Sequence, residues 1–437
     1  MKNPKILIFL TMIGRKSGGM SSALDLAESL YLLGYDLHII LTSSSPQLYR
    51  IKDKRKNSTI IPLSRIHPLP NIYKKFFDKN YSFNLLKLAI EKSKRNGHNF
   101  YFELLGNIFA RNINKLSSFF NANNTCKILM ESDIIIICSG FYTGAREVLS
   151  SLTDAKIILN HAGSVSSFEK WWLTEQHRPI NYNIKLSEYV NHVNQFNYIL
   201  FQAKDQAFEC ETQSNCLKGK TIVIKPSCDE PTVLAAKQLL SPFEKDIYNL
   251  VTIGSIYPLK GQHYAIEALA KIVKLETKVR LHFIGTIPNN EYYAKLLNLV
   301  SHHNLQDKVF FHGFRYDYLR YMAHADLVLQ TSESEGVSRI LRETMLLGIP
   351  IVSFAIPGTT DILTNQEDSI LVQPFDIKKV AEAILFLLNN NDTYNKISQR
   401  SQKRYYLNHS KSNYYNNLIS QINKITEESN EYQRTNY

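Results

Sequence analysis

Short apolar runs recur along the chain, each followed by a polar loop and then by a segment with apolar residues at helical spacing. In the first repeat the run 5–12 precedes a pattern that includes Leu26, Leu30 and Leu33, and Gly34 ends that pattern. Apolar runs of about four to eight residues are typical of parallel strands that are covered on both faces. The predicted strands span residues 5–12, 37–42, 132–140, 156–163, 198–202, 221–226, 249–255, 280–285, 309–312, 327–329 and 351–354.

The alternation of strands and helices predicts an α/β protein with two doubly wound domains. The chain has 437 residues, which is enough for two or three domains with cores of their own. A segment that contains Pro226 and Pro231 separates the two series of strands. We therefore expect a first domain over residues 1–230, a second over 231–405, and a C-terminal helix with a frayed tail over 406–437.

The loop after the predicted strand 327–329 has the pattern most suggestive of a binding site. It is rich in serine and threonine and reaches Glu335 and Gly336. Residues 338–347 then carry apolar side chains at helical spacing, and the turn at 348–350 stops this helix before the next strand. The loop is therefore predicted at the carboxyl end of a parallel strand, where open α/β sheets bind their ligands.

Two carboxylates and a predicted helix N-terminus lie close together in this stretch. The backbone N–H groups of Gly336, Val337 and Ser338 would point out of the helix end, which suits a phosphate group. Glu335 and Glu343 would lie on either side of it, and ionised carboxylates accept hydrogen bonds from hydroxyl groups. A phosphate between hydroxyl-rich groups describes a nucleotide-sugar.

The same two carboxylates also have a purely structural explanation. Glu343 is four residues beyond Arg339, a spacing at which a carboxylate and a guanidinium pair along a helix. Glu335 would be stabilised by the positive end of the helix dipole without binding any ligand. The residues alone leave both explanations open.

The stretch from Glu335 to Met345, followed by Gly348-Ile-Pro350, resembles the signature of the retaining family 4 glycosyltransferases (glycosyl transferases group 1), which have the GT-B fold. The resemblance implies two Rossmann-like domains that face each other across a cleft, with the first on the acceptor side and the last helix returning to it. In that family the first glutamate contacts the transferred sugar and the second contacts the ribose. The resemblance therefore implies these roles for Glu335 and Glu343.

The resemblance also implies roles for residues elsewhere in the chain. Lys260, followed by Gly261, matches the family's phosphate-binding lysine, and Gly18 and Gly19 match its glycine loop near the donor phosphates. His161, at a predicted strand end, matches a histidine that reaches the donor sugar. The structural alternatives are an exposed turn lysine, glycines that serve a tight turn, and a histidine satisfied within the core.

One position departs from the family pattern. Many members have an arginine where this chain has Ser255, so that an arginine and a lysine share the diphosphate. In this chain Lys260 would act alone, or Arg339 would take the arginine's place at the phosphate. No Asp-x-Asp motif for a metal is present, so we expect no metal site and no cofactor other than the nucleotide-sugar itself.

Net charge and composition limit the kinds of partner that the chain is expected to bind. The formal net charge is +12, and half of it comes from residues 71–121, where nine basic and three acidic residues are interleaved with phenylalanine and tyrosine. A basic, aromatic helical insert could lie on an anionic membrane surface, or it could be a solvated basic face with its aromatic residues in the core. Five unpatterned cysteines are typical of a reducing cytosol, and no apolar run reaches the roughly 18 residues of a membrane span.

The sequence therefore predicts a retaining, metal-independent glycosyltransferase that moves a hexose-type sugar to a glycan or lipid-linked acceptor. By resemblance it would act in polysaccharide or cell-surface glycan biosynthesis, in the cytoplasm or peripherally on the inner face of the cell membrane. No motif for nucleic-acid binding is present. A sugar-nucleotide epimerase of the same fold and a non-catalytic subunit of a glycan-assembly complex are the two alternatives.

Overall fold

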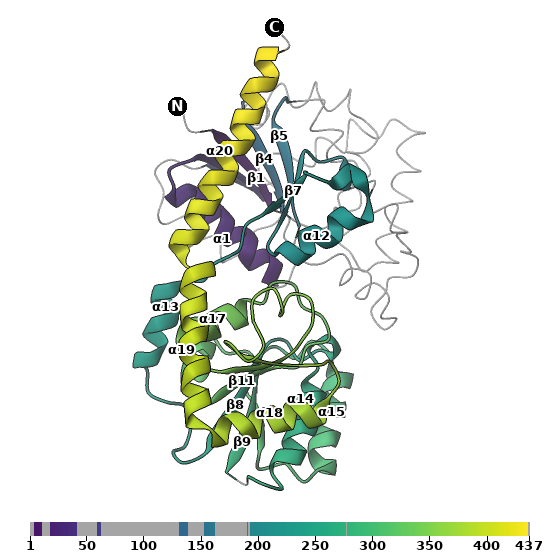
Figure 1. Ribbon diagram of the computed structural model, residues 1–437, viewed down its shortest axis with the longest axis vertical. Helices are drawn as coiled ribbons and strands as arrows, with labels where there is room; N and C mark the ends of the chain where they lie inside the picture. Colours follow the sequence, from purple (N-terminus) through teal and green to yellow (C-terminus); the bar gives the residue numbers. More distant parts are fainter. Residues whose placement is uncertain are drawn as a thin grey trace, which may run out of the picture. The chain divides into compact units, whose positions relative to one another are not determined.

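The computed structural model describes residues 4–10, 18–41, 59–62, 131–138, 153–161, 190, 193–276 and 278–435. The chain divides into two compact units (Figure 1). Unit 1 comprises residues 1–202, 207–224 and 417–437, and unit 2 comprises residues 203–206 and 225–416. The predicted basic insert at 71–121 lies outside the described residues.

Unit 1 is built on a seven-stranded sheet whose paired strands are all parallel, in the order β3-β2-β1-β4-β5-β6-β7. Its central strands are almost entirely aliphatic, as in Ile134–Cys138, where every residue is buried. The last helix of the chain contributes its residues from Asn417 onward to this unit, and the Asn417 side chain donates to the Val223 carbonyl at 3.1 Å. The described strands and helices are β1 (Lys5–Leu10), α1 (Gly18–Leu32), β2 (Asp36–Leu41), β3 (Thr59–Pro62), β4 (Ile134–Cys138), β5 (Lys156–Asn160), β6 (Tyr198–Phe201), α12 (Lys204–Gln213), β7 (Thr221–Val223) and α20 (Lys411–Thr435).

Unit 2 is built on a six-stranded parallel sheet in the order β10-β9-β8-β11-β12-β13. The chain starts in the middle at β8, moves outward to β10, and then returns to fill the other half from β11. The order therefore reverses between β8 and β11, and such switch points are where doubly wound sheets bind ligands. The elements are α13 (Glu230–Ala235), β8 (Tyr248–Ile253), α14 (Gln262–Ile272), β9 (Val279–Ile284), α15 (Asn290–His302), β10 (Val309–Phe311), α16 (Tyr318–Ala323), β11 (Leu327–Gln330), α17 (Arg339–Leu347), β12 (Ile351–Phe354), β13 (Ile370–Val372), α18 (Ile377–Asn389) and α19 (Asn391–Asn408).

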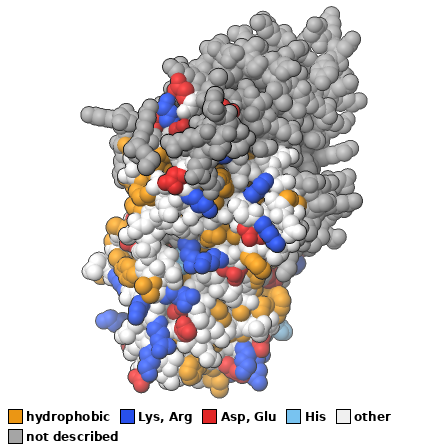
Figure 2. All heavy atoms as spheres, turned by 45° about the horizontal axis from the view of Figure 1, so that its top comes forward, with side chains coloured by type: hydrophobic (Ala, Val, Ile, Leu, Met, Phe, Trp, Pro, Cys, Tyr) orange, Lys and Arg blue, Asp and Glu red, His pale blue; other side chains and the backbone are white. Residues whose placement is uncertain are grey.

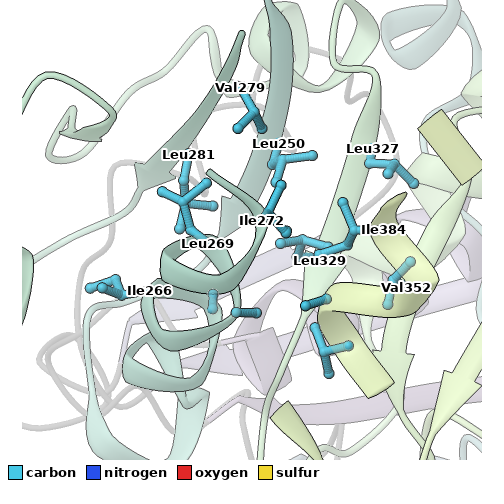
Figure 3. Close-up of a cluster of buried hydrophobic side chains, with 14 of the residues drawn as sticks. Leu250, Ile266, Leu269, Ile272, Val279, Leu281, Leu327, Leu329, Val352 and Ile384 are labelled. Atoms are coloured by element: carbon cyan, nitrogen blue, oxygen red, sulfur yellow. The ribbon is translucent and has the colours of Figure 1, made fainter. Parts of the chain in front are cut away.

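The largest core cluster of unit 2 fixes β8 and β11 against two helices (Figure 3). Leu250 from β8 and Leu329 from β11 are buried with Leu269 and Ile272 from α14 and with Ile384 from α18. Each such side chain contributes ~1.5–3 kcal/mol by leaving water. The core therefore holds the ends of β8 and β11 in a fixed relation, and with them the loops that follow.

The sequence pattern missed two strands, β3 and β13. Both lie at the edge of their sheet and are short, with four residues in Thr59–Pro62 and three in Ile370–Val372. Such runs are too short to show a periodicity, and their pairing is decided by the neighbouring strand.

Two surface properties bear on the predicted partners. No helix in the described part of the chain is long and apolar enough to cross a membrane. On the face drawn in Figure 2, basic and acidic side chains are interspersed over the described surface. The segment predicted to bind a membrane, residues 71–121, lies outside the described residues, so its excess of positive charge is known from the sequence alone.

Candidate functional site

The loop between β8 and α14 carries the predicted phosphate-binding lysine. A single 3-10 turn, Pro258–Lys260, ends at Gly261, which has a left-handed backbone with φ of 61°. A side chain at Gly261 would place its Cβ 2.0 Å from the carbonyl oxygen of Thr331, and the Thr331 hydroxyl donates to the Gly261 carbonyl at 2.8 Å. Glycine is therefore required here, and the Lys260 loop packs directly on the end of β11.

Glu335, in the loop between β11 and α17, contacts that lysine. The Lys260 ammonium lies 2.7 Å from Glu335 Oε1, and the Ser332 hydroxyl donates to the same oxygen at 2.6 Å. The Glu335 side chain is 10% exposed and the Lys260 side chain 35% exposed. Lys260 and Glu335, the residues predicted to contact the donor's phosphate and sugar, thus form an ion pair. Lys260 is the more exposed of the two.

The N-terminus of α17 lies next in the chain. The Ser338 hydroxyl accepts a hydrogen bond from the Leu341 N–H at 3.4 Å, and this caps the helix. Within the described residues, the N–H groups of Gly336, Val337 and Ser338 have no acceptor in the backbone. Such groups and the positive end of the helix dipole together attract an anion.

Gly358, in the loop after β12, packs closely against the backbone just before the N-terminus of α17. A Cβ at Gly358 would lie 2.0 Å from the Gly336 carbonyl oxygen and 2.7 Å from that of Glu335. Its φ of 88° is a second reason why a glycine stands at this position. The sequence at 358–361 resembles the glycine-rich turn of the family, but it does not show which backbone Gly358 approaches.

Glu343 is completely buried, and two side chains hydrogen-bond its carboxylate. The Arg339 Nε donates to its Oε1 at 2.7 Å, and the Tyr318 hydroxyl lies 3.0 Å from both of its oxygens. Burial raises the pKa of Glu343, and the Arg339 guanidinium opposes that rise. The pairing of Glu343 with Arg339, one of the two explanations that the sequence left open, is present. Contact with a ribose stays a prediction.

Sequence reasoning did not find two aromatic residues of this site. Tyr318, on α16, has no motif that links it to a glutamate 25 residues later. The Tyr264 hydroxyl donates to Glu333 at 3.0 Å, and burial with that carboxylate raises the pKa of Tyr264 to about 12. This bond ties the first turn of α14 to the loop that carries Glu335.

The remaining predicted residues belong to unit 1. Gly18 and Gly19 are the first two residues of α1. His161 directly follows β5, is buried, and packs its ring against Phe201 at a centroid distance of 4.9 Å. The structure thus places His161 at the carboxyl end of a strand, as expected, whereas Lys260, Glu335, Gly336, Val337, Ser338, Arg339 and Glu343 gather in unit 2.

Two further observations concern the predicted phosphate-binding and metal-binding chemistry. Ser255, where the resembled family often has an arginine, bonds the Thr286 hydroxyl at 3.0 Å. No group of three or more His, Cys, Asp or Glu side chains suited to a metal ion occurs among the described residues. Lys260, through its pair with Glu335, and Arg339, as the first residue of α17, bring positive side chains to this part of unit 2.

Comparison with known proteins is strongest over unit 2. Residues 240–404 match the family described as glycosyl transferases group 1. The chain is 26% identical over 157 residues to the N-acetyl-alpha-D-glucosaminyl L-malate synthase of Bacillus anthracis. This match covers 36% of this chain and 40% of that protein. It is 25% identical over 187 residues to the poly(glycerol-phosphate) alpha-glucosyltransferase of Bacillus subtilis, covering 43% of this chain and 27% of that protein. The match thus spans less than half of either relative.

Similarity of structure extends over most of the chain. The crystal structure of HepE from Anabaena, in complex with UDP and glucose, superposes with a TM-score of 0.67 at 17% identity, covering 96% of this chain and all of that one. This likeness shows the GT-B fold, with two Rossmann-like domains. Residues 240–404, which carry Lys260, Glu335 and Glu343, thus match the glycosyl transferases group 1 family, and the fold of the chain is that of the GT-B glycosyltransferases.

Proposed function

We propose that this protein is a retaining glycosyltransferase that takes a hexose-type sugar from a nucleotide-diphosphate sugar and passes it to a glycan or lipid-linked acceptor. The observation that carries the proposal is the Lys260–Glu335 pair beside the N-terminus of α17, at the switch point of the unit 2 sheet. There a cation and backbone N–H groups meet a diphosphate, and a carboxylate meets a sugar hydroxyl.

Lys260 and the N-terminus of α17 would stabilise the leaving diphosphate. As the bond from the anomeric carbon to the phosphate oxygen breaks, negative charge grows on that oxygen. A fixed ammonium and fixed N–H dipoles stabilise this charge without needing to reorient, which lowers the barrier. We therefore propose that the reaction needs no metal ion, since this chain supplies positive charge of its own at the leaving group.

Glu335 would orient the transferred sugar, because one of its oxygens already accepts from Lys260 and Ser332 and the carboxylate has further lone pairs for a hydroxyl. In the proposed step the acceptor oxygen attacks the anomeric carbon on the face from which the diphosphate leaves. The acceptor's proton passes to the departing phosphate oxygen, so charge and atoms balance without an enzyme nucleophile. Retention of configuration follows from attack on that face.

The relatives support a role in glycan assembly. The Bacillus subtilis relative is named as a glucosyltransferase for poly(glycerol-phosphate), and the Anabaena structure holds UDP and glucose. By analogy we propose a polysaccharide or cell-surface polymer as acceptor and the cytoplasmic side of the membrane as the place of reaction.

A single assay tests the reaction. The full chain is incubated with UDP-, GDP-, ADP- and dTDP-sugars, each with and without membrane extract, and the products are separated. We expect free nucleoside diphosphate with one donor, and a new glycosidic product with the acceptor. Donor converted to an epimer, or no donor consumed at all, would replace the proposal by the epimerase or the non-catalytic subunit.

Membrane association is a separate proposal that rests on residues 71–121 and their local excess of six positive charges. Each basic residue near an anionic surface contributes ~1 kcal/mol, screened over a Debye length of ~8 Å at physiological salt. We expect the protein to float with vesicles that contain anionic lipid at low salt, and to be released at high salt. If binding does not depend on lipid charge and salt, or if no binding occurs, residues 71–121 are a solvated basic face and not a membrane-binding segment.

A further inference from the structure

The two carboxylates of the candidate site differ in access. The Glu335 side chain is 10% exposed, whereas Glu343 exposes none of its surface. Arg339, whose side chain is 39% exposed, bonds Glu343 through Nε at 2.7 Å. Glu343 in this state can therefore meet a ligand only after a side chain that lies over it has moved.

Arg339 lies between the anion-binding helix end and the buried carboxylate. It is the first residue of α17 and directly follows the N–H groups of Gly336, Val337 and Ser338. Helical side chains lean toward the N-terminus, so Glu343 reaches back to Arg339 at the spacing i,i+4. A guanidinium is a planar fork of five N–H donors, which fits phosphate oxygens as well as a carboxylate.

We propose that Arg339 is a movable cover for Glu343: the diphosphate of the donor draws the Arg339 guanidinium away, and Glu343 then accepts a hydroxyl of the nucleoside. The inference rests on the proposed function, since it concerns how the same donor is bound. It makes recognition of the phosphates and recognition of the nucleoside cooperative, although each uses different side chains.

The hydrogen bonds of Glu343 allow this exchange. The Tyr318 hydroxyl lies 3.0 Å from each oxygen of Glu343, so one donor stays in place when Arg339 leaves. A buried carboxylate that lost every partner would be strongly destabilised, but here the Tyr318 hydroxyl remains and the charge of Arg342 still favours ionised Glu343. The incoming hydroxyl group takes the place of the Arg339 Nε, and the guanidinium keeps a charged partner in the phosphate.

Wild-type protein provides the first test, which needs no substitution. Inorganic pyrophosphate and the nucleoside of the preferred donor are titrated separately and together by calorimetry. We expect saturating pyrophosphate to tighten nucleoside binding ~3–10-fold, and the nucleoside to tighten pyrophosphate binding by the same factor. Independent binding, or mutual exclusion, would overturn the proposal.

The Arg339→Met variant provides the second test and should shift two affinities in opposite directions. Without the Arg339 side chain over Glu343, the nucleoside should bind ~3–10-fold more tightly, because the protein no longer has to move that side chain before the nucleoside can bind. The nucleoside diphosphate binds ~10–100-fold more weakly, because a charged hydrogen-bond donor to phosphate is lost. Arg339→Lys, which keeps the charge, should restore part of the diphosphate affinity.

Arg280→Met is the matched control, since Arg280 also pairs with a glutamate, Glu244 at 2.8 Å, but stands at the amino end of β9. It should change neither affinity. Equal weakening of both ligands by Arg339→Met, or no change in either, would assign Arg339 a merely structural role. If wild-type protein binds no nucleoside diphosphate at all, the proposed function itself fails, and this inference with it.

Discussion

The carboxyl ends of the two sheets carry different chemistry, although both sheets contain the strand order 3-2-1-4-5-6 counted within each unit, to which unit 1 adds a seventh strand. Among the described residues of unit 1, the ends of β4 and β5 present Cys138, Asn160 and His161. The Asn160 amide donates to the Cys138 sulfur at 3.3 Å, burial raises the pKa of that thiol to about 12, and His161 packs on Phe201. In unit 2 the corresponding loops hold Lys260 against Glu335.

The difference shows what topology decides and what the residues decide. A reversal of strand order opens a place for a ligand in each unit, and only the side chains fix what that ligand can be. A cation, a carboxylate and a helix N-terminus together select a phosphorylated, hydroxyl-rich molecule. The described ends of β4 and β5 in unit 1, at Cys138 and Asn160, carry no such pair of a cation and a carboxylate.

The largest expected effect follows from Lys260→Ala. Removing the ammonium takes away charge that stabilises the leaving diphosphate, so kcat at saturating donor should fall by roughly 10²–10³-fold. Steady-state kinetics measures it. Lys295→Ala is the control, because Lys295 is an exposed lysine that pairs with Glu291 on α15. A kcat near the wild-type value in Lys260→Ala would remove the assigned role.

A smaller effect concerns stability. Two glycines with a left-handed backbone, Gly261 and Gly219, should differ in how much an alanine destabilises the protein. Gly261→Ala places a Cβ against the Thr331 carbonyl, whereas Gly219→Ala in unit 1 meets nothing within 4 Å. We expect Gly219→Ala to cost about 1–2 kcal/mol from its positive φ alone, and Gly261→Ala about 3 kcal/mol or more. Chemical denaturation compares them. Equal losses would mean that the Lys260 loop does not pack on β11 as described.

The smallest expected effect concerns pH. Burial, together with the carboxyl of Asp205, raises the pKa of Asp361 to about 6. Because the folded pKa lies above the unfolded value, Asp361 contributes stability that is complete below pH ~4 and is lost as pH rises through about 6.

Thermal melts at pH 4.5 to 7.5 test this for the loop after β12. The melting temperature of the wild type relative to Asp361→Asn should be higher at pH 5 than at pH 7. The variant Asp307→Asn serves as control, because the Asp307 side chain is 75% exposed. A constant difference between wild type and Asp361→Asn across this range would contradict the shift.

Much of the fold could be predicted from the sequence because its central strands are continuous aliphatic runs. The run at 134–138 and the alternation of strands with amphipathic helices were sufficient for two doubly wound units. The Lys260–Gly261 turn and the Glu335 loop were also placed correctly, at the ends of β8 and β11. Adjacent parallel strands end at the same edge of a sheet, so their proximity follows from topology.

The rest depends on contacts between distant segments. Tyr318 reaches Glu343 from another helix, and Gly358 approaches the Gly336 carbonyl from another loop. Neither contact has a local pattern, because a phenol or a glycine is equally common in sites and in ordinary turns. The burial of Glu343 could not be predicted either, since it depends on how Arg339 lies over it.

If the proposed function holds, the α17 N-terminus and the Lys260 loop bind a nucleoside diphosphate. Hydrogen exchange, measured by mass spectrometry with UDP, GDP, ADP and dTDP in turn, tests it most directly. One of these ligands should slow exchange in peptides that cover 254–262 and 331–341, and should leave 156–161 in unit 1 unchanged; Lys260→Ala should weaken the protection. If no diphosphate slows exchange at 331–341, or if protection is confined to unit 1, the donor does not bind at the α17 N-terminus.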